Sequence, residues 1–394
     1  SGQDQVNTLN QLAKNDFTAA TGLKAQVKLV PAGSLLTATL AKKGPDVALS
    51  LPQADPMNYA IRGAVMDLSG FEDFAEVIGR FQTSATLPLT FEGETYGLPE
   101  TQSFNMLFYR EDILEELGLS VPNTWTDVRA MLPVLQKRNM SFGIPANNAE
   151  LSLANFAMFL FQKGGRLYSD NRASSVIADI EGIAAFEEWS SFYTENSLDV
   201  VVDFNTRFRS GEMPIGIANY GTYNTLSVFA PELEGKWSFA PVPGTMREDG
   251  TVDHTVSSTI TACVIMHDAT NPKSAWEFIK WWTSASTQTI YGKELESIMG
   301  TAARYQTANV EAIYNIPWTS ADFSVLKEQL AQTRGIDEVP GSYMTTRYLD
   351  FAFREVINGA EDPGKELISA QLQINSEIDT KRQEFGLPVE EGKR

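Results

Sequence analysis

The chain has 394 residues, of which 50 are acidic and 31 basic, giving a formal net charge of −19. One hydrophobic core does not grow comfortably to this length, so we expect two domains. The acidic balance argues against nucleic acid as a partner, because phosphate binding requires a basic surface, and against docking on anionic lipid. Net charge says little about any single site, so a neutral or a cationic ligand is compatible with it.

Cys263 is the only cysteine, so no intrachain disulfide is expected. That fits a cytosolic protein, or an exported one large enough to fold without disulfides. No run of about 18 apolar residues is present, so we expect no membrane-spanning helix. The start, SGQDQV, has neither a basic segment nor an apolar one, so no signal peptide is expected in this sequence.

The first hundred residues alternate between helical and strand patterns. Apolar side chains at helical spacing predict a helix over 5–20, which Gly22 ends. KAQVKLV (24–30) and PDVALSL (45–51) predict strands. The alternation continues to about residue 109, and this pattern is typical of a parallel α/β sheet.

Further along, two segments carry helix-start signals. Thr124 and Asp127 form a capping-box pattern ahead of an apolar stripe, in which Pro133 predicts a kink or a late start. Asn271 followed by Pro272 predicts the start of another helix. A helix is also predicted in 179–196, short strands in 213–221 and 236–244, a strand in 257–266, and mostly helix in the last third.

Sequence motifs for catalysis and for cofactors are missing. No zinc, EF-hand, phosphate-loop, dinucleotide or nucleophile-elbow motif occurs, so we expect no cofactor and no metal. Cys263 lies in the middle of a predicted strand, which favours a buried, unreactive thiol. His254 follows Asp253 in a polar segment, which favours a loop position over a general base. A glycosidase needs two facing carboxylates, and no local motif picks out such a pair, so we favour a binding protein over an enzyme.

What the sequence does contain is a set of loops rich in aromatic, amide and hydroxyl side chains, placed at the ends of predicted strands. Sugars present apolar CH faces to aromatic rings and hydroxyls to polar side chains. In open α/β sheets such loops gather beyond the carboxyl ends of the strands. We therefore expect a binding cleft. The seven loops are 50–55, 99–103, 218–224, 254–259, 299–304, 315–320 and 340–347.

Five blocks in order resemble the extracellular solute-binding proteins of ABC importers, the family 1 or maltose-binding-like group. They are YAIRGAVMDLSGF, FEGETYGLPETQSFNMLFYREDILEELGLSVPNTWTDV, FRSGEMPIGIANYGTYNTL, WSFAPVPGT and NPKSAWEFIKWWTSASTQTIYG. The resemblance covers nearly the whole chain. It implies an α/β, two-lobed periplasmic-binding-protein-like fold (type II), each lobe a mostly parallel sheet flanked by helices, with the ligand cleft between the lobes.

The resemblance also implies how the chain is divided. Residues 1–104 and 255–310 would form the N-terminal lobe, and 105–254 and 311–394 the C-terminal lobe, with a hinge near Ser103–Asn105. The function implied is non-enzymatic capture of an extracellular solute, a sugar or oligosaccharide, by hinge closure for delivery to an ABC permease. A monomer is expected, in the periplasm or outside the cell, including as a cell-surface lipoprotein.

Ligand-binding residues follow from the resemblance only position by position. The loop after the 45–51 strand implies Gln53 and Asp55, and the 99–103 segment implies Glu100, Gln102 and Ser103. ANYGTYN lies where the family places a stacking aromatic. It implies Tyr220 and Tyr223 for stacking and Asn219 for hydrogen bonding. The other residues implied are Ser257, Ser258, Arg304, Trp318 and Tyr343, whereas Trp237, Trp276, Trp281 and Trp282 are expected in the core.

One departure from the family pattern concerns the first strand. Family members usually begin with a strand ahead of the first helix, whereas this sequence starts in that helix. We therefore expect either a longer parent with an additional N-terminal domain or another segment filling the sheet. Other functions stay open at this point: a secreted carbohydrate-active enzyme, a surface adhesin, or a sensory module. Polyamines, peptides, iron carriers and thiamine are bound by related folds.

Overall fold

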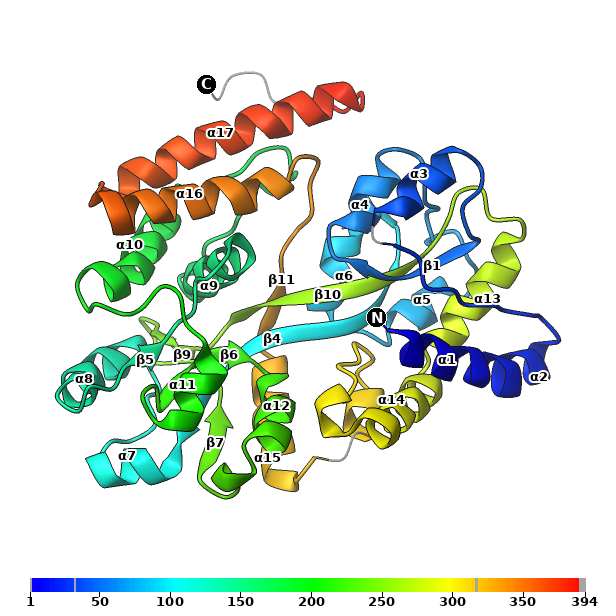
Figure 1. Cartoon of the computed structure of the whole chain (residues 1–394). Coiled ribbons are helices and arrows are strands. Elements are labelled where there is room, and N and C mark those ends of the chain that lie inside the picture. The colour runs from blue at the N-terminus through cyan, green and yellow to red at the C-terminus, as the bar shows by residue number, and fades with distance from the viewer. Residues whose placement is uncertain (1, 32, 316–317, 390–394) are drawn as a thin grey trace. The chain divides into compact units, whose positions relative to one another are not determined.

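The computed structural model describes residues 2–31, 33–315 and 318–389. The chain divides into two compact units (Figure 1). Unit 1 comprises Ser1–Ser103 and Thr259–Trp318, and unit 2 comprises Phe104–Ser258 and Thr319–Arg394. The chain therefore passes between the units three times. The first two passages fall inside the long strands β4 (Leu98–Arg110) and β10 (Val256–Ile265), whereas the sequence placed them after residues 104 and 254.

Unit 1 consists of short N-terminal elements and a C-terminal helical pair. A π-helical turn, Ala13–Phe17, joins the first two helices, and 3-10 turns occur at Leu87–Leu89, Thr301–Ala303 and Ala312–Asn315. Its helices are α1 (Gln3–Leu12), α2 (Thr18–Thr21), α3 (Ser34–Leu40), α4 (Asp55–Ala60), α5 (Phe74–Ile78), α6 (Thr83–Thr86), α13 (Pro272–Trp282) and α14 (Ala285–Met299). Its strands are β1 (Val47–Pro52), β2 (Thr90–Phe91), β3 (Glu94–Thr95) and parts of β4 and β10.

The N-terminal helix predicted over 5–20 is confirmed, and Gly22 ends it with a positive φ of 73°. The strand predicted over 24–30 is wrong. Its first part, 24–28, alternates between exposed and half-buried side chains like a strand, but the segment belongs to no ladder among the described residues. Its backbone is tied instead to the Asn10 side chain, which bonds both the N–H and the carbonyl of Val27, each at 2.8 Å. Alternation specifies an extended backbone, but a strand also needs a partner.

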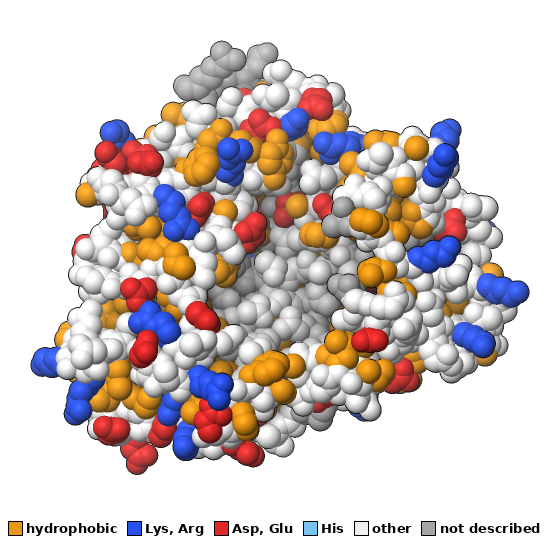
Figure 2. All heavy atoms as spheres, in the orientation of Figure 1, with side chains coloured by type: hydrophobic (Ala, Val, Ile, Leu, Met, Phe, Trp, Pro, Cys, Tyr) orange, Lys and Arg blue, Asp and Glu red, His pale blue; other side chains and the backbone are white. Residues whose placement is uncertain are grey.

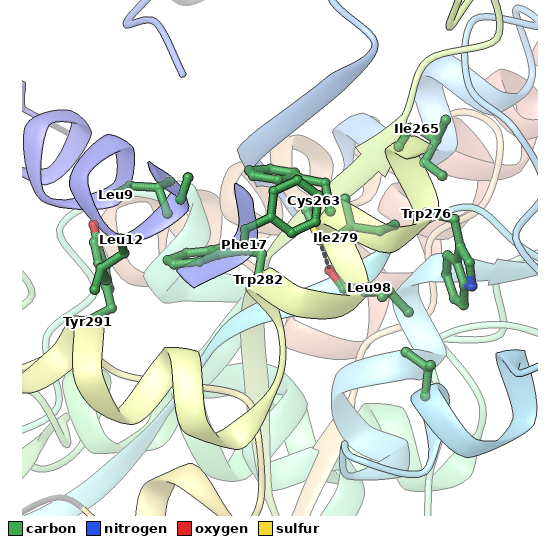
Figure 3. Packing of buried hydrophobic residues seen from close by; sticks show 14 of the residues in the cluster. Leu9, Leu12, Phe17, Leu98, Cys263, Ile265, Trp276, Ile279, Trp282 and Tyr291 are labelled. Atoms are coloured by element: carbon green, nitrogen blue, oxygen red, sulfur yellow. Dashed lines mark hydrogen bonds between the residues drawn. The ribbon is translucent and has the colours of Figure 1, made fainter. Parts of the chain in front are cut away.

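The core of unit 1 forms where helix α1, helix α13 and strand β10 meet (Figure 3). Phe17 packs edge-on against Phe278, with ring centroids 5.4 Å apart. Cys263 is fully buried, and its thiol donates to the Leu98 carbonyl at 3.5 Å, so the expectation of a buried thiol is confirmed. Trp276 and Trp282 are buried as expected, while Trp281 is half-buried.

Unit 2 is larger and mainly helical. It has a 3-10 turn at Pro231–Leu233. Its helices are α7 (Glu111–Leu117), α8 (Trp125–Gln136), α9 (Ala149–Gln162), α10 (Ile180–Thr194), α11 (Phe204–Ser210), α12 (Thr222–Phe229), α15 (Ser320–Leu330), α16 (Tyr343–Gly359) and α17 (Pro363–Glu384). Its strands are β5 (Phe142–Gly143), β6 (Ile215–Asn219), β7 (Trp237–Ala240), β8 (Thr245–Met246), β9 (Val252–Asp253), β11 (Thr333–Gly335) and the remaining parts of β4 and β10.

The strand pairs are not mostly parallel: those within unit 1 are antiparallel, and those of unit 2 are mixed. β1 runs antiparallel to β10 in unit 1, and β4 runs antiparallel to β6 and β7 in unit 2. The parallel pairs are β5 with β6 and β10 with β11. β4 carries the chain from unit 1 into unit 2 and β10 carries it back, so each unit receives long strands that run in opposite directions.

Aromatic side chains fill the core of unit 2. Trp189 stacks on Phe353 with ring centroids 4.0 Å apart, which joins helix α10 to helix α16. Trp125 contacts Phe159 at 4.4 Å, which joins α8 to α9. Helices α16 and α17 pack side by side (Figure 1). The large rings exclude water from a core that the short strands of this unit would not cover alone.

The predicted helix starts are confirmed where a local cap fixes them. The Thr124 hydroxyl accepts from the Asp127 N–H at 3.2 Å, and the Asp127 carboxylate accepts from the Thr124 N–H at 2.8 Å. Helix α8 begins directly after this capping box at Trp125, so Pro133 lies inside the helix and does not delay its start. Asn271 caps α13 through the Ser274 N–H at 3.1 Å. None of the helices in the described ranges is long and apolar enough to cross a bilayer.

Charged side chains of both signs are interspersed over the visible face (Figure 2). Within unit 1, Arg304 pairs with Glu296 at 2.7 Å, and within unit 2, Arg172 pairs with Asp337 at 2.8 Å.

Candidate functional site

The loop that follows β1 starts from a distorted strand. The register of β1 on β10 shifts between Ala48 and Leu51, which marks a β-bulge. Within it, Ser50 adopts a φ of 55°, in the left-handed region that non-glycine residues seldom enter. Bulges re-aim a strand and occur next to functional sites. The predicted ligand loop therefore follows an unfavourable backbone conformation at Ser50, which contacts with the surrounding residues have to stabilise.

The two predicted side chains of this loop are both engaged in unit 1. Gln53 accepts the N–H of Ile260, on β10, at 3.3 Å. Asp55 is the first residue of α4 and is half-buried, and this burial raises the pKa of its carboxyl. A carboxylate at this place lies in the first turn of a helix. The loop thus presents an amide and a carboxylate at the end of β1.

In the segment after Gly97-Leu98-Pro99, side chains alternate between two faces of β4. Glu100 and Gln102 are buried, with 1% and 3% of their surface exposed, whereas Thr101 and Ser103 are half-exposed. Of the three residues that the sequence assigned to ligand here, only Ser103 is on the half-exposed face. The polar run is therefore a strand with period two, and its buried positions are filled by polar groups.

Glu100 is bonded on both carboxylate oxygens. Oε2 accepts the Ser50 N–H, and Oε1 accepts the indole N–H of Trp282. Burial raises the pKa of Glu100 from its ordinary value to about 7, while the two donors oppose the rise. The Glu100 carbonyl accepts the Ala308 N–H at 2.9 Å. One buried acid thus joins β1, β4, α13 and the segment around Ala308.

Neighbouring positions on β4 are also bonded within unit 1. The Gln102 side-chain amide donates to the Ser84 hydroxyl at 2.8 Å, and its backbone N–H donates to the Gln306 carbonyl at 3.0 Å. The hydroxyls of Thr101 and Thr261 lie 2.7 Å apart. Thr101 was not among the residues expected at the site. Strand alternation, which places it on the face opposite Glu100 and Gln102, is the signal that could have indicated it.

The end of β6 supplies the candidate residues of unit 2. Asn219 lies opposite Asn105 in the β4–β6 register and is exposed, and its side-chain oxygen accepts the Gly221 N–H at 2.8 Å. Tyr220 is buried. Its ring stacks on Phe104 with centroids 4.8 Å apart, and this burial raises the pKa of its phenol. Asn219 is therefore the exposed residue of this pair, whereas the Tyr220 ring is buried against Phe104.

Tyr223, the second residue of α12, is half-buried and lies against aromatic rings. Its ring meets Trp237 and Phe239 edge-on, with centroids 5.5 Å away in each case. Its hydroxyl donates to the Asp322 carboxylate, on α15, at 3.0 Å. Asp322 and the half-buried Trp237 are thus neighbours of the predicted aromatic. Asp322, on α15, was not singled out from the sequence, and Trp237 was expected in the core.

Ser257 and Ser258 lie on β10, opposite Arg334 and Gly335 of β11. Both are buried, and the Ser257 hydroxyl donates to the Ala154 carbonyl at 3.2 Å. They therefore join β10 to helix α9 and strand β11 within unit 2. Their role as ligand contacts stays a prediction.

The last three predicted residues lie in two separate places. In unit 1, Arg304 pairs with Glu296 and its guanidinium carbon lies 5.2 Å from the ring centroid of Trp318. In unit 2, Tyr343 begins α16, is half-exposed, and donates its hydroxyl to Glu377 of α17 at 2.5 Å. The structure thus brings Arg304 and Trp318 together and joins Tyr343 to a helix rather than to a loop.

The His254 ring and the Cys263 thiol each lie against a backbone carbonyl. His254 Nδ1 lies 2.6 Å from the Val242 carbonyl, which ties the ring to the backbone. Burial raises the pKa of Cys263 well above its usual range, so the thiol stays protonated. Across residues 2–31, 33–315 and 318–389, no cluster of three or more His, Cys, Asp or Glu side chains is arranged to hold a metal ion.

A curated relative of this chain is a candidate binding protein of Brucella abortus (strain 2308). The two sequences are 23% identical over 249 residues, which is 59% of this chain and 58% of the relative. A candidate binding protein of Brucella suis matches over the same extent. The match therefore spans less than two thirds of the length of these relatives.

Solved structures match the fold over nearly the whole chain. The sugar-binding protein MalE of Xanthomonas citri matches with a TM-score of 0.82 at 17% identity, covering 98% of each chain. A cyclo/maltodextrin-binding protein complexed with maltotetraose matches with a TM-score of 0.75 at 19% identity, covering 96% of this chain and 94% of the other. An ABC transporter solute-binding protein of Thermotoga lettingae, bound with α-D-tagatose, matches with a TM-score of 0.72 at 18% identity, covering 95% and 96%.

These matches establish the fold expected from the sequence, that of the two-lobed sugar-binding proteins. A sequence profile described as bacterial extracellular solute-binding protein matches residues 1–289, which is well over half of the chain. The protein therefore belongs to the bacterial extracellular solute-binding family.

Proposed function

We propose that the protein captures an extracellular sugar or oligosaccharide, leaves it chemically unchanged, and delivers it to an ABC permease. The observation that carries the sugar assignment is the group at the end of β6. Exposed Asn219 ends β6, and Tyr223, at the start of the following helix α12, has Trp237 and Asp322 beside it. Aromatic rings offer a surface to the CH face of a sugar, and amide and carboxylate groups bind its hydroxyls.

Two further findings support this proposal. In unit 1, the end of β1 adds Gln53 and half-buried Asp55, which are also hydroxyl-binding groups. Among the structures that share the fold, one is described with maltotetraose and another with α-D-tagatose. We propose that Ser103 and Trp318, which were also assigned from the sequence, contribute to solute binding.

The proposed mechanism is hinge closure at the places where the chain passes between units. Those places are Ser103–Phe104, Ser258–Thr259 and Trp318–Thr319. Predicted ligand residues lie directly at each of them, namely Ser103, Ser258 and Trp318. A solute bound near a hinge would stabilise one closure state over another, which is the usual basis of capture in two-lobed receptors. We further propose a monomer that works in the periplasm or at the cell surface.

The test is calorimetry on the whole chain with two panels of solutes. One holds maltotetraose, mannotriose and tagatose, and the other holds spermidine, a tripeptide and thiamine. We expect heat from at least one sugar and none from the second panel. Binding confined to the second panel, or no sugar binding up to millimolar concentration, would contradict the sugar assignment.

Two additions sharpen this test. Tyr223→Ala should weaken sugar binding at least tenfold, because it removes a stacking surface, whereas the control Tyr314→Ala changes an exposed tyrosine of unit 1 and should not. The same mixtures are then analysed for products. Unchanged sugar is expected of a binding protein, and sustained release of reducing ends would identify an enzyme instead.

A further inference from the structure

Glu100 is the most deeply buried acid whose contacts reach the candidate loop of unit 1. Its side chain is 1% exposed, yet both of its oxygens accept hydrogen bonds, and the two donors come from different elements. Ser50 belongs to β1, and Trp282 ends α13 within the apolar cluster drawn in Figure 3. Glu100 therefore bonds both to the strand that leads into the loop and to the core of unit 1.

The bond to Ser50 answers a specific need of the bulge. In a bulge, one extra residue is left unpaired and the ladder is locally disrupted, so its backbone groups need other partners. Here the register shift lies between Ala48 and Leu51, and the Ser50 N–H points to Glu100 instead of β10. Since Ser50 also holds a φ of 55°, this bond supports a backbone conformation that would otherwise relax.

A carboxylate is the side chain that suits this position. Two N–H donors meet there, and an ionised carboxylate offers acceptors on both oxygens. A glutamine amide offers one acceptor and would turn its NH₂ toward the second donor. A protonated acid has the same defect, because its O–H faces a donor. The position therefore distinguishes Glu from Gln although the two side chains have nearly the same shape.

We propose that Glu100 is a positioning residue of the solute site: its carboxylate holds the Ser50 bulge, and through it the loop that carries Gln53 and Asp55. The role of Glu100 in solute binding rests on the proposed function. Its role in holding the loop does not. The proposal replaces the expectation that Glu100 itself contacts solute, because the two oxygens that would do so are already bonded inside unit 1.

Three titratable groups interact with Glu100, and of these four groups Glu100 is the one whose charge changes near neutral pH. Cys263 on β10, Tyr291 on α14 and Tyr305 after the 3-10 turn at Thr301–Ala303 all interact with it electrostatically. Burial raises the pKa of all three groups, so they stay neutral around pH 7. Glu100, with a pKa of about 7, changes charge in that range.

The first experiment needs no solute. Amide hydrogen exchange is measured by NMR on the whole chain for Glu100→Gln and for the control Glu92→Gln, which removes an exposed acid of unit 1. We expect the amides of Ser50, Gln53 and Asp55 to exchange at least tenfold faster in E100Q and to be unchanged in E92Q. Unchanged exchange at these three amides in folded E100Q would overturn the proposal.

A second measurement on the unmodified protein covers the case in which E100Q does not fold. If one carboxylate accepts from both donors, the Ser50 amide proton and the Trp282 indole proton must shift together as pH is varied from 5 to 9. Different midpoints, or a Ser50 resonance that does not move, would overturn the proposal. Ser50→Gly keeps the N–H and accepts the φ, so it should retain the shared titration.

Solute binding then separates this proposal from the proposed function. With maltotetraose as the probe, E100Q should raise Kd at least tenfold while E92Q leaves it unchanged. An unchanged Kd in E100Q, despite a loosened loop, would overturn the positioning role in binding. If the unmodified protein binds no sugar, the proposed function fails, and hydrogen exchange alone decides whether Glu100 holds the loop.

Discussion

The two candidate loops are held in place by different means. After β1, the loop of unit 1 depends on a buried carboxylate and on a strained backbone position at Ser50. After β6, the loop of unit 2 depends on rings, with Tyr220 stacked on Phe104 and Tyr223 against Trp237 and Phe239. One loop is supported by charge and hydrogen bonds, the other by packed volume.

This difference determines what each loop should be sensitive to. A packed ring responds to loss of volume and hardly to pH, because it has no charge near neutrality. A buried carboxylate responds to pH and to isosteric replacement, because its two donors need an ionised acceptor. Volume changes should therefore disturb unit 2, and changes of charge should disturb unit 1.

The largest effect is expected from Tyr220→Ala. Tyr220 is buried, so its truncation leaves a cavity beside Phe104 and should lower the free energy of unfolding by about 3–5 kcal/mol. Native-state hydrogen exchange of the β6 amides measures this change within unit 2. Tyr220→Phe keeps the ring and should cost far less. A loss below about 1 kcal/mol in Y220A would show that ring packing does not hold this loop.

The next effect is the pH dependence of unit 1. The pKa of Glu100 is about 7 in the folded state and ordinarily 4.5, so the folded state binds more protons between these values. Its contribution to stability is therefore complete below pH 4.5 and is lost as pH rises through 7, by about 3 kcal/mol in all. Urea unfolding at pH 5 and pH 8 measures the slope. E100Q should reduce this dependence of the unfolding free energy on pH, and E92Q should leave it unchanged. Equal slopes in all three proteins would contradict the expected pH sensitivity of unit 1.

The smallest effect is expected from Tyr223→Phe. The substitution removes the hydroxyl that donates to Asp322 at 3.0 Å, a bond between half-buried groups that contributes about 1 kcal/mol. Thermal unfolding should show a small decrease that does not vary between pH 6 and pH 8. Asp322→Asn keeps an acceptor and should lose less. A decrease as large as that of Y220A would mean that hydrogen bonding, rather than packing, supports the loop of unit 2.

Several elements were predictable because their signals lie within a few residues of each other. The Thr124–Asp127 capping box, the Asn271 cap and the Gly22 helix end are each local contacts, and each occurs where the sequence indicated. The blocks of family resemblance fixed the fold class. By contrast, residues 24–30 show that alternation alone does not make a strand, since no ladder partner is found among the described residues.

The candidate site was predictable to the loop but not to the side chain. The sequence singled out the polar run from Glu100 to Ser103 as a ligand segment, which stays a prediction, and it could not tell that Glu100 and Gln102 are buried. Glu100 is buried because Trp282, 182 residues away, and Ser50, 50 residues away, donate to it. Caps and periodicity are determined by neighbours in the chain. The environment of a polar side chain is decided by partners that only the tertiary structure brings to it, and here those partners determine whether an acid lines a site or supports it from within.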